Sequence, residues 1–447
     1  MNRRSFLRRA GCLSTALFAG CIQRTKTSDP RRYVINATDI SEQTRERIEI
    51  IHDLPKLDLV VGYVAPELVE SAATFRDSKS FLSPEMRIYV AGNANISGED
   101  LYELQWDKKS QSVRECHKET RGGGITIGIV GTGVIDNHPD LAPALNSARS
   151  RNVTEDSGDH TPIGGRSHAT HVAGIIAGAG RDGGITGVAP DAEVLDYRVT
   201  TRHGVLAGDL LAALGYAIED GCDVVNVSQN WYPYMPESGH DLLLDALERV
   251  AARAKIEGTN VVCSAGNNAK RLSPDSPPFA LLTNVESFVT VSATAPTGYN
   301  WPAISSNETI RDYPVDPSSA VDEPACTPTA YTNYGQETVT VSAPGGEIDE
   351  NALDNYPGAR YDGILSTSFS YQPNSSSEKR VPGYGWADGT SFAAPQVTGA
   401  LALLRSKNPA LSSEAARLRL RETAKKKDPL QYRGAGHLDL KSLLSVR

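Results

Sequence analysis

Three short blocks of this 447-residue sequence hold residue types that can carry out nucleophilic chemistry together. Ser391 follows Gly389 and Thr390 and opens a run of small residues, 392–402, that suits a buried helix. In the first turn of a helix, free N–H groups and the helix dipole favour the negative charge of an activated serine. The same pattern also fits an ordinary buried helix with a threonine cap.

The two other blocks supply the partners that a serine nucleophile needs. His168 lies in a second small-residue block, 167–174, and Asn267 ends a strand-like run, 261–267. A serine requires a base to take its proton and a preset donor to hold the oxyanion. His168 suits the first role and Asn267 the second, so the three blocks predict acyl transfer through Ser391.

In their residues and in their order along the chain, these blocks resemble the motifs of the subtilase family of subtilisin-like serine peptidases. Around the histidine the family reads Gly-His-Gly-Thr-His-Val-Ala-Gly, and this chain reads Ser-His-Ala-Thr-His-Val-Ala-Gly from residue 167. Around the serine the family reads Gly-Thr-Ser-Met-Ala-x-Pro, and this chain reads Gly-Thr-Ser-Phe-Ala-Ala-Pro from residue 389. A long spacing with His before Ser also suits this family and not the α/β-hydrolases. The resemblance implies a secreted endopeptidase that acts on peptides or proteins and needs no cofactor.

The chain departs from the family where the acid of the catalytic triad is expected. The first strand of the family ends in Asp-Thr-Gly, whereas this chain has Gly131 in place of the Asp. Asp136 lies five residues further on, and Asp196 lies on a strand that we expect beside the first. Both are candidates for the missing carboxylate, and the sequence does not choose between them. An alternative is a catalytically impaired pseudopeptidase that binds extended peptides; an esterase has only the nucleophile to support it.

The resemblance also implies where a substrate lies. An extended peptide would pair through backbone hydrogen bonds with two segments that follow strands. A side chain at the third position of the first segment replaces the glycine usual in the family, which changes the shape of the pocket. The segments comprise Ser228, Gln229, Asn230, Ser264, Ala265 and Gly266.

The elements that must position these groups alternate between strands and helices from residue 122 to the end. Apolar runs at 125–130, 194–199, 223–228, 261–267 and 288–293 predict strands, and 206–218 and 242–255 predict helices. Such alternation predicts an α/β domain over 122–447, with a mostly parallel sheet and helices on both faces.

The part before residue 122 predicts a smaller α+β domain and a connection. Residues 32–97 show strand patterns at 33–36, 57–64 and 86–90, and helix patterns at 41–54 and 66–75. This arrangement resembles the propeptide domain that many subtilases carry as folding aid and inhibitor; an unrelated accessory domain is the alternative. Residues 98–121 are polar and charged, and we expect a linker that would hold any processing point.

The first 21 residues have the features of an export signal. Paired arginines, Arg3 and Arg4, precede Ser-Phe-Leu and an apolar stretch too short to span a bilayer, which is typical of twin-arginine signals. Small residues before Cys21 resemble a lipoprotein processing site, so we expect a lipid anchor at Cys21 and an extracytoplasmic location. The alternative is a plain cleaved signal with an incidental cysteine.

Composition narrows the classes of partner and site. The formal net charge is −9, which argues against nucleic acid as a partner. The four cysteines beyond the leader show no metal-ligand spacing, and those beside strand-like runs suit buried free thiols. The loop 178–184 lacks the Asn and Asp ligands typical of a calcium site.

Overall fold

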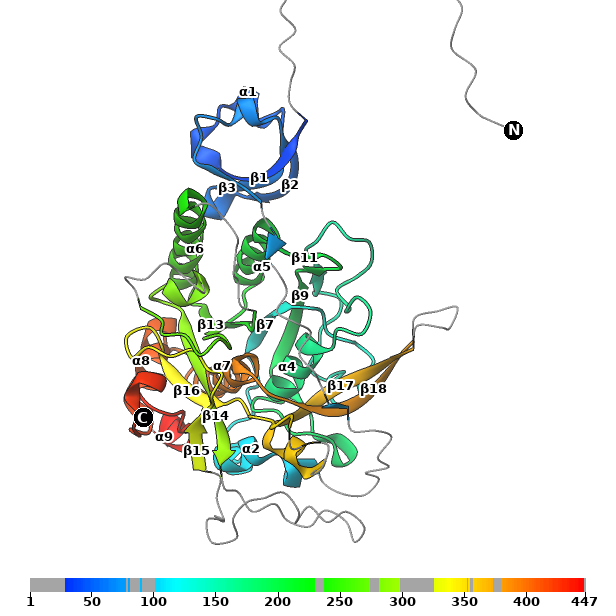
Figure 1. Cartoon of the computed structure of the whole chain (residues 1–447), viewed down its shortest axis with the longest axis vertical. Coiled ribbons are helices and arrows are strands. Elements are labelled where there is room, and N and C mark those ends of the chain that lie inside the picture. Colours follow the sequence, from blue (N-terminus) through cyan, green and yellow to red (C-terminus); the bar gives the residue numbers. More distant parts are fainter. Residues whose placement is uncertain are drawn as a thin grey trace, which may run out of the picture.

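The chain folds into an α/β body with a small antiparallel sheet at one end, as the computed structural model shows (Figure 1). The leader with Cys21 lies outside the residues that the structure describes. In the described residues, no helix has the length and apolarity needed to cross a membrane. The structure describes residues 29–77, 79–80, 89–90, 101–229, 237–273, 281–297, 325–351, 353, 357–372 and 379–445.

The body is built on an eight-stranded sheet in the order β15-β14-β13-β12-β7-β9-β8, with β16 beside β14. All neighbouring strands run parallel except the pair β14 and β15. The central strands are rich in Val and Ile because helices cover both of their faces. The strands are β7 (Thr126–Gly131), β8 (Arg151–Asn152), β9 (Glu193–Arg198), β12 (Val224–Val227), β13 (Asn260–Ser264), β14 (Val289–Thr297), β15 (Ala325–Pro328) and β16 (Val341–Pro344).

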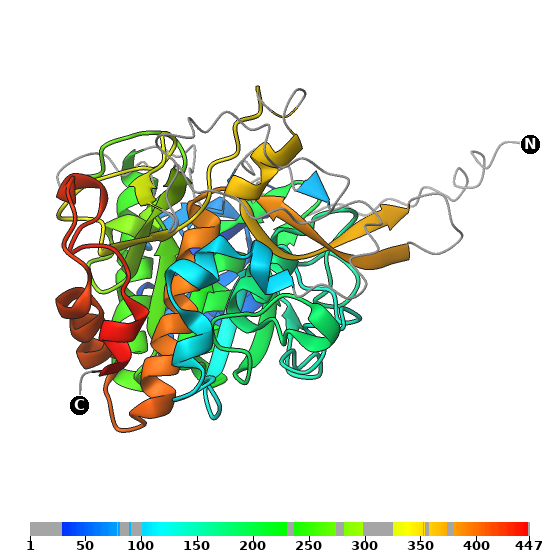
Figure 2. The same ribbon diagram turned by 90° about the horizontal axis from the view of Figure 1, so that it is seen from below.

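Helices on the two faces of this sheet bury two separate cores. The face with α4 (His168–Ala177) and α7 (Thr390–Lys407) holds one core, together with α8 (Ser413–Thr423) and α9 (Leu440–Ser445). The other face is covered by α5 (Ala207–Glu219) and α6 (Glu237–Glu257). Figure 2 shows α7 in orange running the length of the body. The predicted α/β class, with helices on both faces of a mostly parallel sheet, is confirmed.

The N-terminal domain is an antiparallel sheet in the order β2-β3-β1-β4, and its described residues include one short α-helix, α1 (Glu42–Arg45). The helices predicted at 41–54 and 66–75 are therefore wrong over most of their length. The apolar residues of 49–54 fit a helical period, yet His52 and Leu54 are buried and Asp53 is exposed, as in a strand. Pairing with β3 overrides the local pattern. The strands are β1 (Arg31–Asn36), β2 (Glu49–Leu54), β3 (Leu59–Val64) and β4 (Thr74–Arg76).

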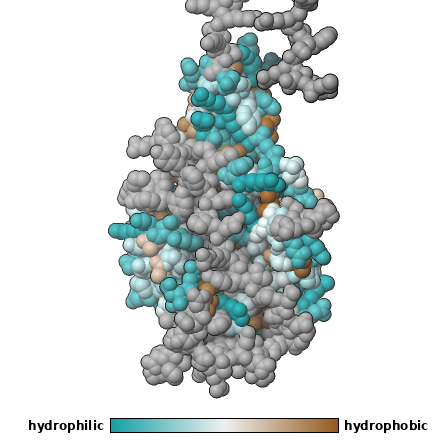
Figure 3. Space-filling model, turned by 45° about the vertical axis from the view of Figure 1, so that its right-hand side comes forward, coloured by the Kyte–Doolittle hydropathy of each residue, from teal (hydrophilic) through white to brown (hydrophobic). Residues whose placement is uncertain are grey.

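One face of this small sheet packs onto helices α5 and α6. Leu54, Val61 and Phe75 of the sheet share a core with Leu210 and Leu214 of α5. The opposite face carries its own small cluster around Ile35 and Val60. On the face drawn in Figure 3, the coloured surface is mostly hydrophilic. The N-terminal domain is thus attached to the body by an apolar interface.

The segment predicted as a linker, 98–121, is instead part of the body from residue 101 onward. It forms α2 (Trp106–Ser110) and α3 (Val113–Cys116), and Trp106 is fully buried. Lys108 is also fully buried and donates to Asp107 at 2.6 Å and to Gln396 of α7 at 3.0 Å. A polar composition predicts a linker, but the charges of Asp107 and Lys108 pair with each other inside the protein.

Candidate active site

The candidate site lies at the carboxyl ends of adjacent parallel strands. Gly131 ends β7, Ser228 follows β12, and Asn267 follows β13; β7, β12 and β13 are neighbours in the sheet. Helices α4 and α7, which pack on the same face, begin at His168 and Thr390. The crevice outside the carboxyl ends of the strands is where α/β sheets generally bind ligands. The fold therefore brings the three sequence blocks to one edge.

Asn267 is fixed beside Ser391 by the threonine that precedes the serine. The Asn267 Oδ1 atom accepts from the Thr390 N–H at 3.0 Å and from the Thr390 hydroxyl at 2.6 Å. Because a backbone N–H can only donate, Oδ1 is the acceptor and Nδ2 is left as the free donor. Asn267 is exposed, so Nδ2 is available to an incoming carbonyl oxygen. Sequence reasoning gave Thr390 only a capping role and missed this one.

Ser391 lies in the first turn of α7, and only 5% of it is exposed. Its hydroxyl donates to the carbonyl oxygen of Ser228 at 3.0 Å, rather than to His168. The backbone N–H groups of this first turn have no partner within the helix, which suits an oxyanion. Before a base could take its proton, the Ser391 hydroxyl would have to rotate and break its hydrogen bond to the Ser228 carbonyl oxygen.

His168 is the first residue of α4, and its ring centroid lies 5.6 Å from that of Phe392, the residue after Ser391. Thr132 holds the start of the helix, since its hydroxyl accepts from the Ala169 N–H at 2.9 Å. Burial lowers the pKa of His168 to about 4, and no charged group contributes to that shift. His171 has a structural role: its Nε2 meets the Ile364 carbonyl oxygen at 3.0 Å, and burial lowers its pKa to about 3.

Gly131 leaves space at the strand end where the family acid would lie. A Cβ built on Gly131 would lie 3.0 Å from the Cβ of Ala169, the residue after His168. The position thus faces the start of α4, as a residue that orients His168 must. Among the described residues, His168 forms no hydrogen bond or ion pair with a carboxylate.

The two candidate replacement acids lie elsewhere in the site region. Asp196 is on β9 beside β7, as expected, but it is fully buried and its Oδ2 contacts His160 Nδ1 at 3.0 Å and accepts from the Val134 N–H at 2.8 Å. Asp136 is exposed in the loop after β7 and raises the pKa of His160. His160 gave no signal in the sequence, because it stands alone in a loop of small and acidic residues.

The segments predicted to bind substrate are partly engaged within the protein. The Ala265 N–H donates to Val291 at 2.9 Å, and the Gly266 N–H donates to the Thr390 hydroxyl at 3.0 Å. Gln229 Nε2 donates to the Thr200 hydroxyl at 3.1 Å, and Ser264 is buried. Asn230 lies outside the described residues.

The edge of strand β11 (Gly204–Leu206), beside the site, is paired with another segment of the same chain. The hairpin of β10 (Thr200–Thr201) and β11 (Gly204–Leu206) pairs antiparallel with β5 (Lys79–Ser80). Further along, β6 (Tyr89–Val90) pairs with β18 (Lys379–Ala387), the partner of β17 (Ile364–Gln372) and the strand that leads into Ser391. The segment that leaves the N-terminal domain thus pairs with edges that flank the site.

Comparison with known proteins agrees with this geometry. The model of the subtilase family matches residues 122–437. The chain is 25% identical to subtilisin DY of Bacillus licheniformis over 72% of its own length and 91% of that protein. It is 27% identical to the major intracellular serine protease of Bacillus subtilis over 65% of its length and 70% of the relative.

Solved structures show the same fold. The crystal structure of the epidermin leader peptide processing serine protease from Staphylococcus aureus superposes with a TM-score of 0.69 at 19% identity, covering 93% of this chain and 98% of that one. Fervidolysin from Fervidobacterium pennivorans gives 0.64 at 20% identity, covering 95% of this chain and 62% of that one. The match over most of the chain, together with the shared fold, places this protein in the subtilase family of serine peptidases.

Proposed function

We propose that this protein is a secreted serine endopeptidase with Ser391 as nucleophile, His168 as base, and Asn267 with the Ser391 N–H as the oxyanion hole. The observation that carries the proposal is the Asn267 amide, whose Oδ1 accepts two hydrogen bonds from Thr390, the residue before Ser391, so that Nδ2 remains as a donor. A preset donor of this kind is worth about 10²–10³ in rate. The test is hydrolysis of an internally quenched peptide by the purified protein, with covalent labelling of Ser391.

A pseudopeptidase that binds extended peptides is the second candidate. Gly131 provides no carboxylate for His168, and burial lowers the pKa of that histidine to about 4. Loss of the acid is costly without being fatal, since subtilisin without it loses about 3 × 10⁴ in kcat and still turns over. The preserved nucleophile and oxyanion donor favour a slow enzyme, because a binding protein needs neither.

We further propose that the N-terminal domain inhibits the peptidase. The support is twofold: β5 pairs with the free edge β11, and a buried ion-pair cluster fixes the domain to α5. Arg32 of β1 contacts Asp77 at 2.9 Å and also pairs with Asp209 of α5, and both carboxylates are fully buried. His52 Nε2 contacts the same Asp209 at 3.0 Å. Removing Arg32 would leave Asp77 and Asp209 buried without the guanidinium that pairs with both, which destabilises the contact.

An Arg32→Ala variant of the full chain should therefore show a shorter lag, or a higher initial rate, on a peptide substrate than the parent. Arg45→Ala is the matched control, because Arg45 pairs with Asp53 on the surface of the same domain and should leave the lag unchanged. Thermal melting verifies that both variants are folded. Equal lags in all three folded proteins would show that the domain is not an inhibitor.

We also propose export by the twin-arginine route and lipid attachment at Cys21, on the strength of the leader sequence. Mass spectrometry of the N-terminal peptide from a membrane fraction should then show a modified Cys21, and Cys21→Ser should release the protein into the soluble extracytoplasmic fraction. A soluble parent protein that begins after residue 21 would contradict lipidation and leave export standing.

A further inference from the structure

A pocket of about 530 Å³ opens beside the candidate site, on the side of His168. Its walls come from the loop before α4, from the end of β9 with the turn between β10 and β11, and from β18. Its lining includes Asp156, Asp159, Arg198, Arg202, His203 and Arg380. A concave pocket with a few convergent charged groups is the usual form of a recognition site.

The pocket is attached to the catalytic region by backbone contacts. Arg198 is paired in register with Gly131, and the next residue, Val199, donates its N–H to the Gly131 carbonyl at 3.0 Å. Arg166, two residues before His168, donates to the Thr201 carbonyl at 3.1 Å and so ties the histidine loop to the turn. The pocket wall is therefore hydrogen-bonded to the strand that ends at Gly131 and to the loop that precedes His168.

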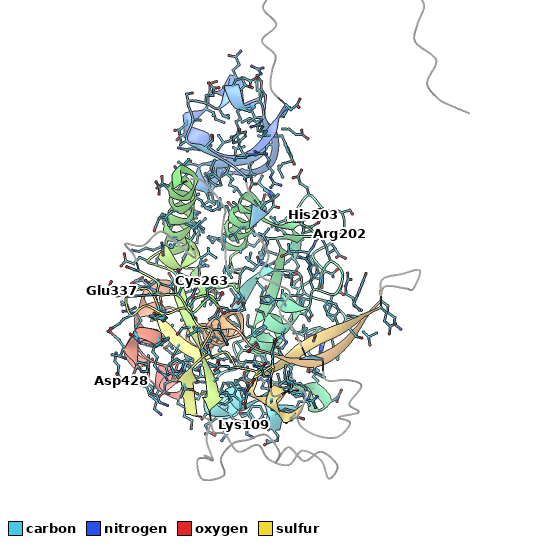
Figure 4. All side chains as sticks on the ribbon, viewed as in Figure 1. Lys109, Arg202, His203, Cys263, Glu337 and Asp428 are labelled. Carbon is cyan, nitrogen blue, oxygen red and sulfur yellow. The ribbon has the colours of Figure 1, made fainter. Side chains whose placement is uncertain are left out.

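The direction of a bound strand leads a substrate past this pocket. In the pairing of β5 with β11, Lys79 lies opposite Leu206 and Ser80 opposite Val205. A peptide bound to the edge in this register runs on toward Gly204 and then toward the turn that carries His203. Figure 4 labels Arg202 and His203, which lie together at this turn. Side chains of the substrate on the N-terminal side of the scissile bond would face the pocket mouth.

The charges on the pocket wall favour an anion. Three arginines, Arg198, Arg202 and Arg380, face two aspartates, Asp156 and Asp159. Burial lowers the pKa of Arg198, and the like charge of Arg380 lowers it further. Among the nearby carboxylates, Asp156 opposes this shift most strongly. Asp159 accepts from the Thr161 N–H at 2.9 Å and from its hydroxyl at 2.6 Å. Asp159 is thus engaged by Thr161, whereas the buried Oδ2 atom of Asp156 has no hydrogen-bond partner among the described residues.

Arg202 is the arginine of this wall whose side chain has no partner among the described residues. Its side chain is exposed, and it forms no hydrogen bond or ion pair with any residue in the described part of the chain. A guanidinium presents its donors in a planar fork that matches a carboxylate. We propose that the pocket is a specificity subsite for an acidic side chain, Asp or Glu, on the N-terminal side of the bond that is cleaved. This inference rests on the peptidase function proposed above.

The test uses matched fluorogenic peptides that differ only by Glu, Gln or Lys, scanned over four positions N-terminal to the cleaved bond. At one position the parent should prefer Glu to Gln by roughly two- to fivefold in kcat/KM, chiefly through KM, because the contact is an ion pair near the surface. The preference should shrink with added salt. Arg202→Gln should remove most of the preference, whereas Arg121→Gln, at an exposed arginine outside the pocket, should leave both the preference and the rates unchanged.

Equal rates for Glu and Gln at every position, or an undiminished preference in Arg202→Gln, would overturn the subsite. If no peptide is cleaved, the peptidase proposal has failed, and the subsite is then judged by binding of the same labelled peptides in fluorescence anisotropy. Tighter binding of a Glu peptide than of its Gln partner, lost in Arg202→Gln, would support the pocket without catalysis. Equal binding would refute it.

Discussion

A Ser391→Ala variant should lose all covalent labelling by a fluorophosphonate probe and nearly all peptide hydrolysis. In subtilisin, loss of the serine costs about 2 × 10⁶ in kcat and loss of the acid about 3 × 10⁴. Because this chain lacks the acid at Gly131, the further loss on removing Ser391 should be only roughly 10²-fold. The measurement is kcat on one quenched peptide, with labelling read by mass spectrometry.

Ser406→Ala is the matched control for this experiment. Ser406 lies on the same helix, where its hydroxyl donates to the Gly123 carbonyl at 2.7 Å, far along the chain from the first turn. Its replacement should leave labelling and rate unchanged. Labelling that persists in folded Ser391→Ala would contradict the assignment of the nucleophile. A much larger loss, near that of a complete triad, would indicate that another group already supports His168.

The second large effect is a gain of activity in Gly131→Asp. An aspartate at this strand end would orient His168 and stabilise the imidazolium that forms during attack. The benefit appears mainly in the transition state, so kcat should rise by about 10²–10⁴ with little change in KM. The backbone allows the change, since Gly131 does not have the left-handed φ that disfavours other residues. The new Cβ requires Ala169, 3.0 Å away, to shift by a few tenths of an ångström.

The same variant should move the pH profile. Burial alone sets the pKa of His168 to about 4, against an ordinary value of 6.5, so the parent keeps its base neutral and active well below pH 6. A neighbouring carboxylate favours the charged imidazolium and raises that pKa. The acid limb of kcat/KM for Gly131→Asp should therefore lie at higher pH than in the parent. Two profiles on the same peptide measure the shift.

Two further variants separate geometry from charge. Gly131→Asn places a neutral side chain of nearly the same shape at the position and should give neither the full gain in rate nor the shift of the acid limb. Thermal melting distinguishes a misfolded variant from an inactive one. If folded Gly131→Asp has the rate and pH profile of the parent, Asp196→Asn in the parent decides whether that buried carboxylate already acts; a loss of activity would show that it does.

The sequence by itself was enough for the family and for the class of fold. The block around Ser391 and the block around His168 are local patterns, and each begins a helix at the residue that the pattern predicts to within one position. Alternating apolar runs predicted the parallel sheet because buried parallel strands are nearly continuous in Val and Ile. The absence of an acid at Gly131 is likewise readable from the sequence, as a departure from a motif.

The tertiary structure decided everything that depends on pairing between distant residues. Residues 49–54 became a strand because β3 was available as a partner, and Lys108 was buried because Asp107 and Gln396 compensate its charge. The carboxylate of Asp196 faces His160, a partner 36 positions away, which no spacing along the chain indicates. Strand periodicity states which face a side chain takes, but the group that it meets depends on how loops fold over that face.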